Sequence, residues 1–293
     1  MADLPPTEAT NPRTAGLDLL ETRTLVDAIL TDQHAAVDAV LTQAPTIAQA
    51  VDEITDRLEC GGRLHYVGAG SSGRIAMLDA TEMAPTFGVP PELMRAHIAG
   101  GAMALVRAVE GAEDDADAGA SVVRDFVNRG DVVVGISASG AAAFVVAAIN
   151  AAKSMSLLTV GITNAADSEL AHAAEIAIVL ATGSEVLAGS TRLKAGTAQK
   201  ITLNAISTAV MVRLGKVYDN LMVDVVASNK KLRARALRLI QHLAGVDEER
   251  ARDLLAMAAG RVKVAVVMQR HGVDPEEAKA LLDCHDGSLR ALM

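Results

Sequence analysis

Two short loops rich in glycine and serine are the clearest candidates for chemistry in this sequence. The first, Gly68–Gly73, reads GAGSSG and stands between an apolar segment that predicts a strand and a segment that predicts a helix. The second, Ser137–Gly140, reads SASG in the same setting. Glycines admit a ligand close to the backbone, hydroxyls donate hydrogen bonds, and a helix N-terminus favours an anion. A single loop of this kind is as often a plain tight turn, but two together predict an anion site formed by Gly70, Ser71, Ser72, Ser137, Ser139 and Gly140.

The first loop lacks the features of a nucleotide site. Its glycines match the spacing GxGxxG, but the next predicted strand, 93–98, runs into Ala99 and Gly100 without the acidic residue that would bind a ribose. The loop also lacks a Walker-type lysine. Serines in place of bare glycines therefore predict a monophosphate held by hydroxyl groups.

Glutamates near these loops could transfer protons. Glu82 lies late in the helix that the first loop opens, and Glu110 and Glu113 lie in the segment VEGAED. A carboxyl group in partly dry surroundings has a raised pKa and can donate or accept a proton near neutral pH. The alternative for Glu113 and Asp114 is that they only favour a helix N-terminus.

A third polar cluster precedes a predicted helix at 191–213. Its density of hydroxyl and basic side chains suits a sugar or a carboxylate, and the candidate ligands are Ser190, Arg192 and Lys194. The alternative is a capped and solvated helix N-terminus.

The elements that must position these residues alternate along the chain. Helical periodicity at 17–41 and 46–58 is followed by short, almost continuously apolar strands at 64–67, 93–98, 131–136, 157–162 and 175–180, with helical segments between them. This pattern predicts an α/β fold with a parallel sheet covered on both faces, a three-layer αβα arrangement. Three short helical patterns after about residue 246 predict a small C-terminal helical domain. The expected division is 1–60, 61–228 and 229–293.

Composition excludes several classes of function. The net charge is −9 and aromatic residues make up 2% of the chain, which argues against a nucleic-acid partner. Two cysteines are too few for a disulfide framework and predict a reducing, cytoplasmic setting. The start of the chain lacks the features of a signal peptide, no apolar stretch is long enough to cross a membrane, and the histidines show no metal-binding spacing.

Longer motifs carry a family resemblance. The segments GAGSSGR (68–74), DATEMAPTF (79–87), AVEGAED (108–114), GSTRLKAGTAQK (189–200) and GKVYDNLMVDVVASN (215–229) resemble the N-acetylmuramic acid 6-phosphate etherase family. The resemblance implies a flavodoxin-like SIS (sugar isomerase) domain, a small C-terminal helical domain and a homodimer with its site near the subunit interface.

The resemblance also implies a reaction, which needs neither metal nor cofactor. It is cleavage of the lactyl ether of N-acetylmuramic acid 6-phosphate to N-acetylglucosamine 6-phosphate and D-lactate, in recycling of cell-wall amino sugars. By matching motifs, Glu82 is expected to be the acid that assists lactate departure, and Glu113 the base at carbon 2.

One segment departs from the family. Where the family usually reads SGRTPY, Ser139 and Gly140 are followed by Ala141, Ala142 and Ala143, so a threonine that commonly bonds the phosphate is replaced by Ala142. This departure keeps a second hypothesis open, a non-catalytic sugar-phosphate sensor similar to the SIS protein that regulates glucokinase. An aldose–ketose isomerase lacks support in the motifs, and a transcription regulator lacks room for a helix-turn-helix.

Overall fold

The computed structural model describes residues 5–225 and 230–293. The chain divides into two compact units, the first formed by Met1–Thr81 with Glu92–Ser207 and the second by Glu82–Pro91 with Thr208–Met293. The three-part division expected from the sequence stays a prediction.

A five-stranded parallel sheet forms the centre of the first unit, in the order β2-β1-β3-β4-β5. β1 (Leu64–Gly68), β3 (Val132–Ser137) and β4 (Leu158–Thr163) are buried along their whole length. β2 (Met94–Ile98) and β5 (Ile176–Val179) form the edges. Strands buried on both faces need apolar residues at every position, which is the pattern the sequence shows. The predicted parallel α/β sheet is confirmed.

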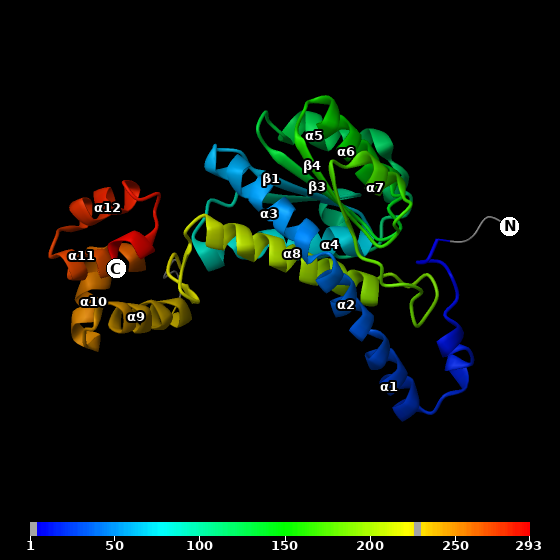
Figure 1. The fold of residues 1–293 in the computed structure, drawn as a ribbon, viewed down its shortest axis with the longest axis horizontal. Helices are drawn as coiled ribbons and strands as arrows, with labels where there is room; N and C mark the ends of the chain where they lie inside the picture. The colour runs from blue at the N-terminus through cyan, green and yellow to red at the C-terminus, as the bar shows by residue number, and fades with distance from the viewer. Residues whose placement is uncertain (1–4, 226–229) are drawn as a thin grey trace. The chain divides into compact units, whose positions relative to one another are not determined.

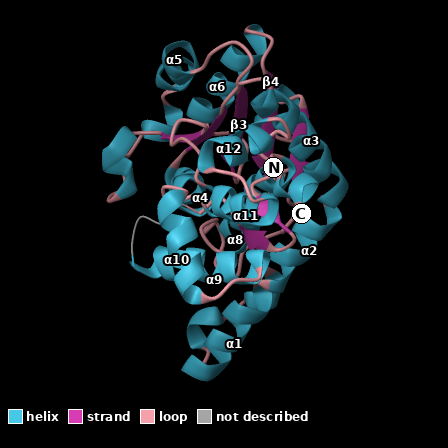
Figure 2. Ribbon diagram, turned by 90° about the vertical axis from the view of Figure 1, so that its left-hand side faces the viewer, coloured by secondary structure: helices cyan, strands magenta, loops and turns pink. Residues whose placement is uncertain are grey.

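Helices cover both faces of this sheet (Figures 1 and 2). On one face lie α5 (Ala116–Phe126), α6 (Ala143–Ser154) and α7 (Glu169–Ala173); on the other lie α3 (Ala44–Glu59), α4 (Gly70–Phe87) and α8 (Lys194–Arg213). Val67, Val133, Val145 and Ile149 belong to the apolar core between the sheet and α6. The three-layer arrangement brings the C-terminal ends of the strands to one edge of the sheet.

Residues 17–41 form several helices where the periodicity predicted one, whereas the second predicted helix, 46–58, corresponds to α3. Two short 3-10 turns, Pro12–Thr14 and Leu17–Leu19, precede α1 (Thr22–Asp32) and α2 (His34–Thr42). The helices break at Gln33, and α1 extends away from the sheet (Figure 1). None of the described helices is long and apolar enough to cross a membrane.

The second unit has its own apolar core, formed by its helices α9 (Lys230–Ala244), α10 (Glu248–Met257), α11 (Val262–His271) and α12 (Pro275–Asp283), followed by a 3-10 turn at Leu289–Leu292. The sequence predicted the last three of these helices. The loop predicted at 215–220 instead contains an antiparallel pair, β6 (Val217–Tyr218) and β7 (Leu221–Met222). Its turn residue Asp219 has a φ of 55°, which short hairpin turns require and aspartate tolerates.

Candidate active site

The two glycine–serine loops lie at the point where the strand order of the sheet reverses. β1 and β3 are neighbours, and Gly68 at the end of β1 is in register with Ile136 in β3. The order β2-β1-β3-β4-β5 places the crevice of a doubly wound sheet between the ends of β1 and β3. Both loops leave that crevice and open directly into α4 and α6. The structure therefore brings the two predicted halves of the anion site together.

Two positions of the first loop, Gly68 and Gly73, have no room for any residue larger than glycine. A Cβ on Gly68 would lie 2.7 Å from the backbone nitrogen of Gly73, and a Cβ on Gly73 would lie 2.9 Å from the carbonyl oxygen of Gly68. The close approach of these two backbones lets α4 begin at Gly70, immediately beside the strand end. Ser71 at the start of α4 is half-buried, and Gly70 is exposed.

A buried chain of amide and hydroxyl groups fixes Ser72. The Ser72 hydroxyl donates to Gln199 Oε1 at 2.8 Å, Gln199 Nε2 donates to Asn164 Oδ1 at 3.2 Å, and Asn164 Nδ2 donates to the Leu180 carbonyl at 3.0 Å. These bonds join α4, α8 and the ends of β4 and β5. Sequence reasoning missed Asn164, although its place directly after an apolar strand was an available signal.

The second loop is held by its own hydroxyls and by β4. Gly140 N donates to Ser137 Oγ at 3.1 Å, and Ala141 N donates to Ser139 Oγ at 3.3 Å. Gly140 has a φ of 68°, and a Cβ there would lie 2.2 Å from Ser168 Oγ, so no larger residue fits. α6 then begins at Ala143 without a side-chain cap at Ala142. The first turn of α6 therefore has no side-chain acceptor for its N–H groups, which is the condition an anion site at a helix N-terminus requires.

Arg74 links the start of α4 to the segment that follows β2, and the turn that carries Glu113 comes a few residues later in the chain. From the first turns of α4, Arg74 Nε donates to the Ala104 carbonyl at 2.9 Å, and its terminal nitrogen donates to the Arg107 carbonyl at 3.3 Å. Glu113 lies in a 3-10 turn, Ala112–Asp114, which packs against α6. Gly100, just after β2, contacts Ala112 so closely that a Cβ would lie 3.2 Å from the Ala112 Cβ. Glu113 is thus placed at the same edge of the sheet as the two loops, and its side chain is exposed.

Glu82 lies late in α4, in the Glu82–Pro91 segment of the second unit, and is also exposed. One turn earlier, Asp79 is buried and anchors the helix. Asp79 accepts hydrogen bonds from Tyr66 Oη at 3.1 Å, Asn204 Nδ2 at 2.6 Å and Ser207 Oγ at 3.0 Å. Burial raises the pKa of Asp79, although these three donors oppose the shift. The bonds fasten α4 to β1 and α8, and so fix the helix that carries Glu82.

The third cluster forms the start of α8. Ser190 is half-buried and Arg192 is exposed, but Lys194 is only 1% exposed. Lys194 Nζ donates to Asp32 Oδ1 of α1 at 2.9 Å. Glu185 accepts from the backbone nitrogens of Lys194 at 3.1 Å and Ala195 at 2.9 Å, so this buried carboxylate caps the helix. Burial raises the pKa of Glu185. The assignment of Ser190, Arg192 and Lys194 to substrate stays a prediction.

Within the described part of the chain, His, Cys, Asp and Glu side chains form no group of three that could hold a metal ion. The two glycine–serine loops with the starts of α4 and α6, here called the cradle, lie at one edge of the parallel sheet. Their binding of an anion stays a prediction, as does the role of the exposed Glu113.

This fold and this cradle define a SIS-domain protein. Residues 105–209 match the SIS domain family, residues 46–153 match the N-terminal SIS domain of glucokinase regulatory protein, and residues 219–271 match the C-terminal lid domain of glucokinase regulatory protein. Among solved structures, a phosphoheptose isomerase from Francisella tularensis is similar in fold, with a TM-score of 0.54 and 20% identity over 66% of this chain and 100% of that one.

Curated relatives narrow the class further. N-acetylmuramic acid 6-phosphate etherases from Nostoc sp. and Deinococcus radiodurans are 48% and 47% identical to this chain, covering 97% and 100% of it and 93% and 96% of their own lengths. The enzyme of that name from Serratia proteamaculans is 46% identical over 98% of this chain and 97% of its own. The chain belongs to the N-acetylmuramic acid 6-phosphate etherase family.

Proposed function

We propose that this chain cleaves the lactyl ether of N-acetylmuramic acid 6-phosphate, giving N-acetylglucosamine 6-phosphate and D-lactate. The observation that carries the proposal is the pair of glycine–serine loops at the neighbouring ends of β1 and β3, together with the packing of the Glu113 turn against α6, the helix that the second loop opens. The names and coverage of the relatives support this substrate.

The proposed reaction is an elimination followed by addition of water. With the sugar open, the aldehyde acidifies the proton on carbon 2, and Glu113 removes it. Electrons from that C–H bond form the double bond between carbons 2 and 3, and the bond between carbon 3 and the lactyl oxygen breaks. Glu82 protonates the departing oxygen and, as the resulting carboxylate, takes a proton from the water that adds to carbon 3. Glu113 then returns its proton to carbon 2. The loops with Gly70, Ser71, Ser72, Ser137, Ser139 and Gly140, and the cluster with Ser190, Arg192 and Lys194, are assigned to substrate binding.

Both glutamates are exposed in the single chain. A carboxyl group has a raised pKa only where its surroundings exclude water. The partly dry setting that such proton transfers require must therefore be supplied by bound substrate or by a second subunit.

The test follows D-lactate release and exchange of the carbon-2 proton with deuterium oxide. Glu82→Gln and Glu113→Gln should each lower lactate release by about 10²–10⁴-fold, the usual contribution of a general acid or base. Only Glu113→Gln should also abolish exchange at carbon 2. Glu110→Gln, an exposed neighbour in the same segment, serves as the matched control and should retain activity.

The same assay separates the enzyme from a sugar-phosphate sensor. The sensor alternative is favoured by the lid-domain match and by the absence of a hydroxyl at Ala142. Sugar phosphate that binds to the unaltered chain without lactate release would establish the sensor instead.

We also propose that the chain acts as a homodimer. α1 and α2 expose Val26, Leu30, Val37 and Leu41 at helical spacing, with 62% of Leu30 and 66% of Leu41 accessible, and a second copy could bury this stripe. Sedimentation should show a dimer that Leu30→Glu dissociates. Met257→Glu, a similarly exposed apolar position on α10, should leave it intact. A monomeric unaltered chain would contradict the proposal.

A cytoplasmic location is part of the same proposal. Cys60 and Cys284 are both free and exposed, a state that a reducing compartment preserves. Fractionation of cells that express a tagged chain would test the location.

A further inference from the structure

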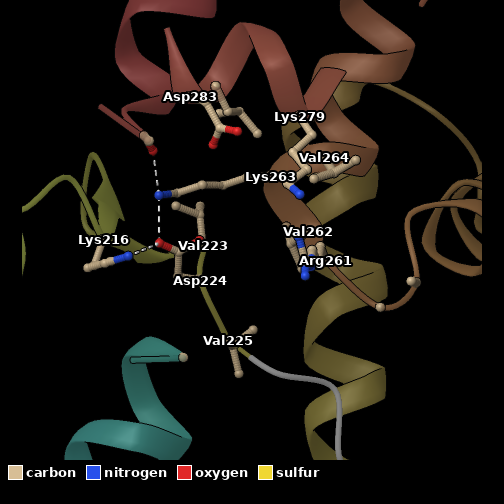
Figure 3. Close-up of a pocket in the computed structure, with 15 residues that line it drawn as sticks. Lys216, Val223, Asp224, Val225, Arg261, Val262, Lys263, Val264, Lys279 and Asp283 are labelled. Carbon is tan, nitrogen blue, oxygen red and sulfur yellow. Dashed lines mark hydrogen bonds and ion pairs between the residues drawn. The ribbon is translucent and has the colours of Figure 1, made fainter. Parts of the chain in front are cut away.

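The second unit contains a pocket of about 540 Å³ whose lining residues all belong to this unit (Figure 3). Its walls come from the segments that flank the β6–β7 pair, from the start of α11 and from α12. The charged side chains that line it are four cations and two carboxylates: Lys216, Arg261, Lys263, Lys279, Asp224 and Asp283. A local excess of positive charge is unexpected in a chain whose net charge is −9.

One side of the pocket is a preorganised charge cluster. Lys263 is buried, and its Nζ donates to Asp224 Oδ2 at 2.6 Å and to the carbonyls of Gly215 at 2.9 Å and Gly287 at 2.6 Å. Lys216 Nζ lies 3.4 Å from the same oxygen of Asp224. Asp224 thus faces two ammonium groups, and it opposes the lowering of the Lys263 pKa that burial causes. Asp283 adds a second carboxylate to the pocket, so the excess of positive charge comes from Arg261 and Lys279.

The other side joins two exposed cations to a helix N-terminus. Figure 3 shows Arg261 and Lys279 beside the start of α11. Neither forms an ion pair with a carboxylate among the described residues. α11 is a ten-residue helix, and Arg261 at its N-cap provides no side-chain acceptor. Its first N–H groups and its dipole favour a negative charge, yet the side chains placed there are cations, an arrangement that an anion would stabilise.

We propose that this pocket binds a small organic phosphate, of the size of a sugar phosphate or a nucleoside monophosphate. The phosphate would accept hydrogen bonds from Arg261, Lys279 and the first turn of α11, as phosphates do at basic helix N-termini. Val223, Val225 and Leu282 supply an apolar wall for the organic part. The pocket shares no lining residue with the proposed catalytic site, and the proposal does not depend on the etherase activity.

The experiment titrates the full-length, ¹⁵N-labelled chain with inorganic phosphate, glucose 6-phosphate and AMP. The amide resonances of Val262, Lys263 and Val264 should shift with each probe. At least one ester should bind more tightly than inorganic phosphate because of the apolar wall. Loss of two charged donors in Arg261→Ala/Lys279→Ala should weaken binding at least about tenfold.

Matched variants make the outcome decisive. Arg252→Ala removes an exposed cation of α10 outside the pocket, so this variant should bind the esters like the unaltered chain. Arg261→Lys/Lys279→Arg keeps both positive charges and should retain most of the affinity. Ser71→Ala, in the first unit, should leave the α11 shifts unchanged. Shifts confined to 68–73 and 137–140, equal affinity in the alanine double variant, or inorganic phosphate as tight as both esters would each overturn the proposal. Both replaced side chains are exposed, and an unchanged melting temperature verifies the fold.

Discussion

At the scale of single residues, two adjacent serines of the first loop have different environments. The Ser72 hydroxyl is buried and commits its proton to Gln199 Oε1 at 2.8 Å. Ser71 is half-buried, and its hydroxyl bonds to no other described residue. A phosphate dianion only accepts hydrogen bonds, so the Ser71 hydroxyl is available to donate to it. The Ser72 hydroxyl already donates its proton to Gln199.

We therefore expect Ser71→Ala to change substrate binding and Ser72→Ala to change stability. Ser71→Ala should raise KM for the sugar phosphate about tenfold with stability unchanged, since it removes one donor to a charged group. Ser72→Ala should lower the free energy of unfolding by about 1–2 kcal/mol, since it leaves Gln199 without its partner. Steady-state kinetics and urea unfolding measure both effects. A Ser72→Ala variant with a changed KM alone would assign that hydroxyl to the ligand.

Lys194 provides a second prediction at this scale. It pairs with Asp32, whose side chain is 5% exposed, so Lys194→Met would leave this buried carboxylate with only the exposed and more distant Arg13, at 3.6 Å. The free energy of unfolding should fall by about 3 kcal/mol, and Asp32→Asn in the same chain should restore part of it. Lys200→Met, an exposed position on the same helix, should change stability little. Lost substrate affinity with normal stability would instead place Lys194 against the substrate.

At the scale of elements, the start of α6 lacks a side-chain cap. Ala142 has the extended backbone of an N-cap residue, with φ −61° and ψ 112°, but no side chain that can cap. Serine and threonine at such positions accept a hydrogen bond from the first turn of the helix. The segment Ala141–Ala143 therefore lacks both a helix cap and the hydroxyl that the family usually presents to phosphate.

Ala142→Thr should stabilise the chain by about 1 kcal/mol through the restored cap. It should also tighten phosphate binding. Ala142→Val has nearly the same shape without the hydroxyl and should show neither gain. Thermal unfolding and titration with substrate measure the two effects. Equal behaviour of the threonine and valine variants would show that the loop already has another donor.

At the scale of the whole molecule, a buried ionisable chain in the sheet links stability to pH. Asp131 accepts from His65 Nε2 at 3.1 Å, and His97 Nε2 donates to His65 Nδ1 at 3.1 Å. Burial, together with the neighbouring His65 and Arg95, lowers the pKa of His97 to about 4 from an ordinary 6.5. Between these two values the unfolded chain binds more protons than the folded one.

Stability should therefore fall as pH decreases from about 6.5 to 4. The expected loss from His97 is on the order of 3 kcal/mol. His97→Gln keeps a donor for His65 without a titrating ring, so its unfolding should depend less on pH in this window. His172→Gln removes an exposed histidine and should behave like the unaltered chain. Equal pH dependence in all three proteins would contradict this account.

The sequence by itself determined the local features of this protein. Continuous apolar runs gave the buried strands, and paired glycines placed the turns at their ends, because both depend on neighbours in the chain. The order of strands and helices then brought the loops after β1 and β3 to one edge. For these reasons the fold and the position of the two glycine–serine loops could be predicted, while their binding of an anion stays a prediction.

Only the tertiary structure determined which partner each polar side chain binds. Ser72 forms its hydrogen bond with Gln199, 127 residues away in the sequence, and Lys194 forms its own with Asp32, 162 residues away. A hydroxyl or an ammonium group has the same pattern of neighbours in the chain whether it faces a ligand or a buried partner. Its role depends on which distant segment packs against it, and packing of that kind exists only in the folded chain.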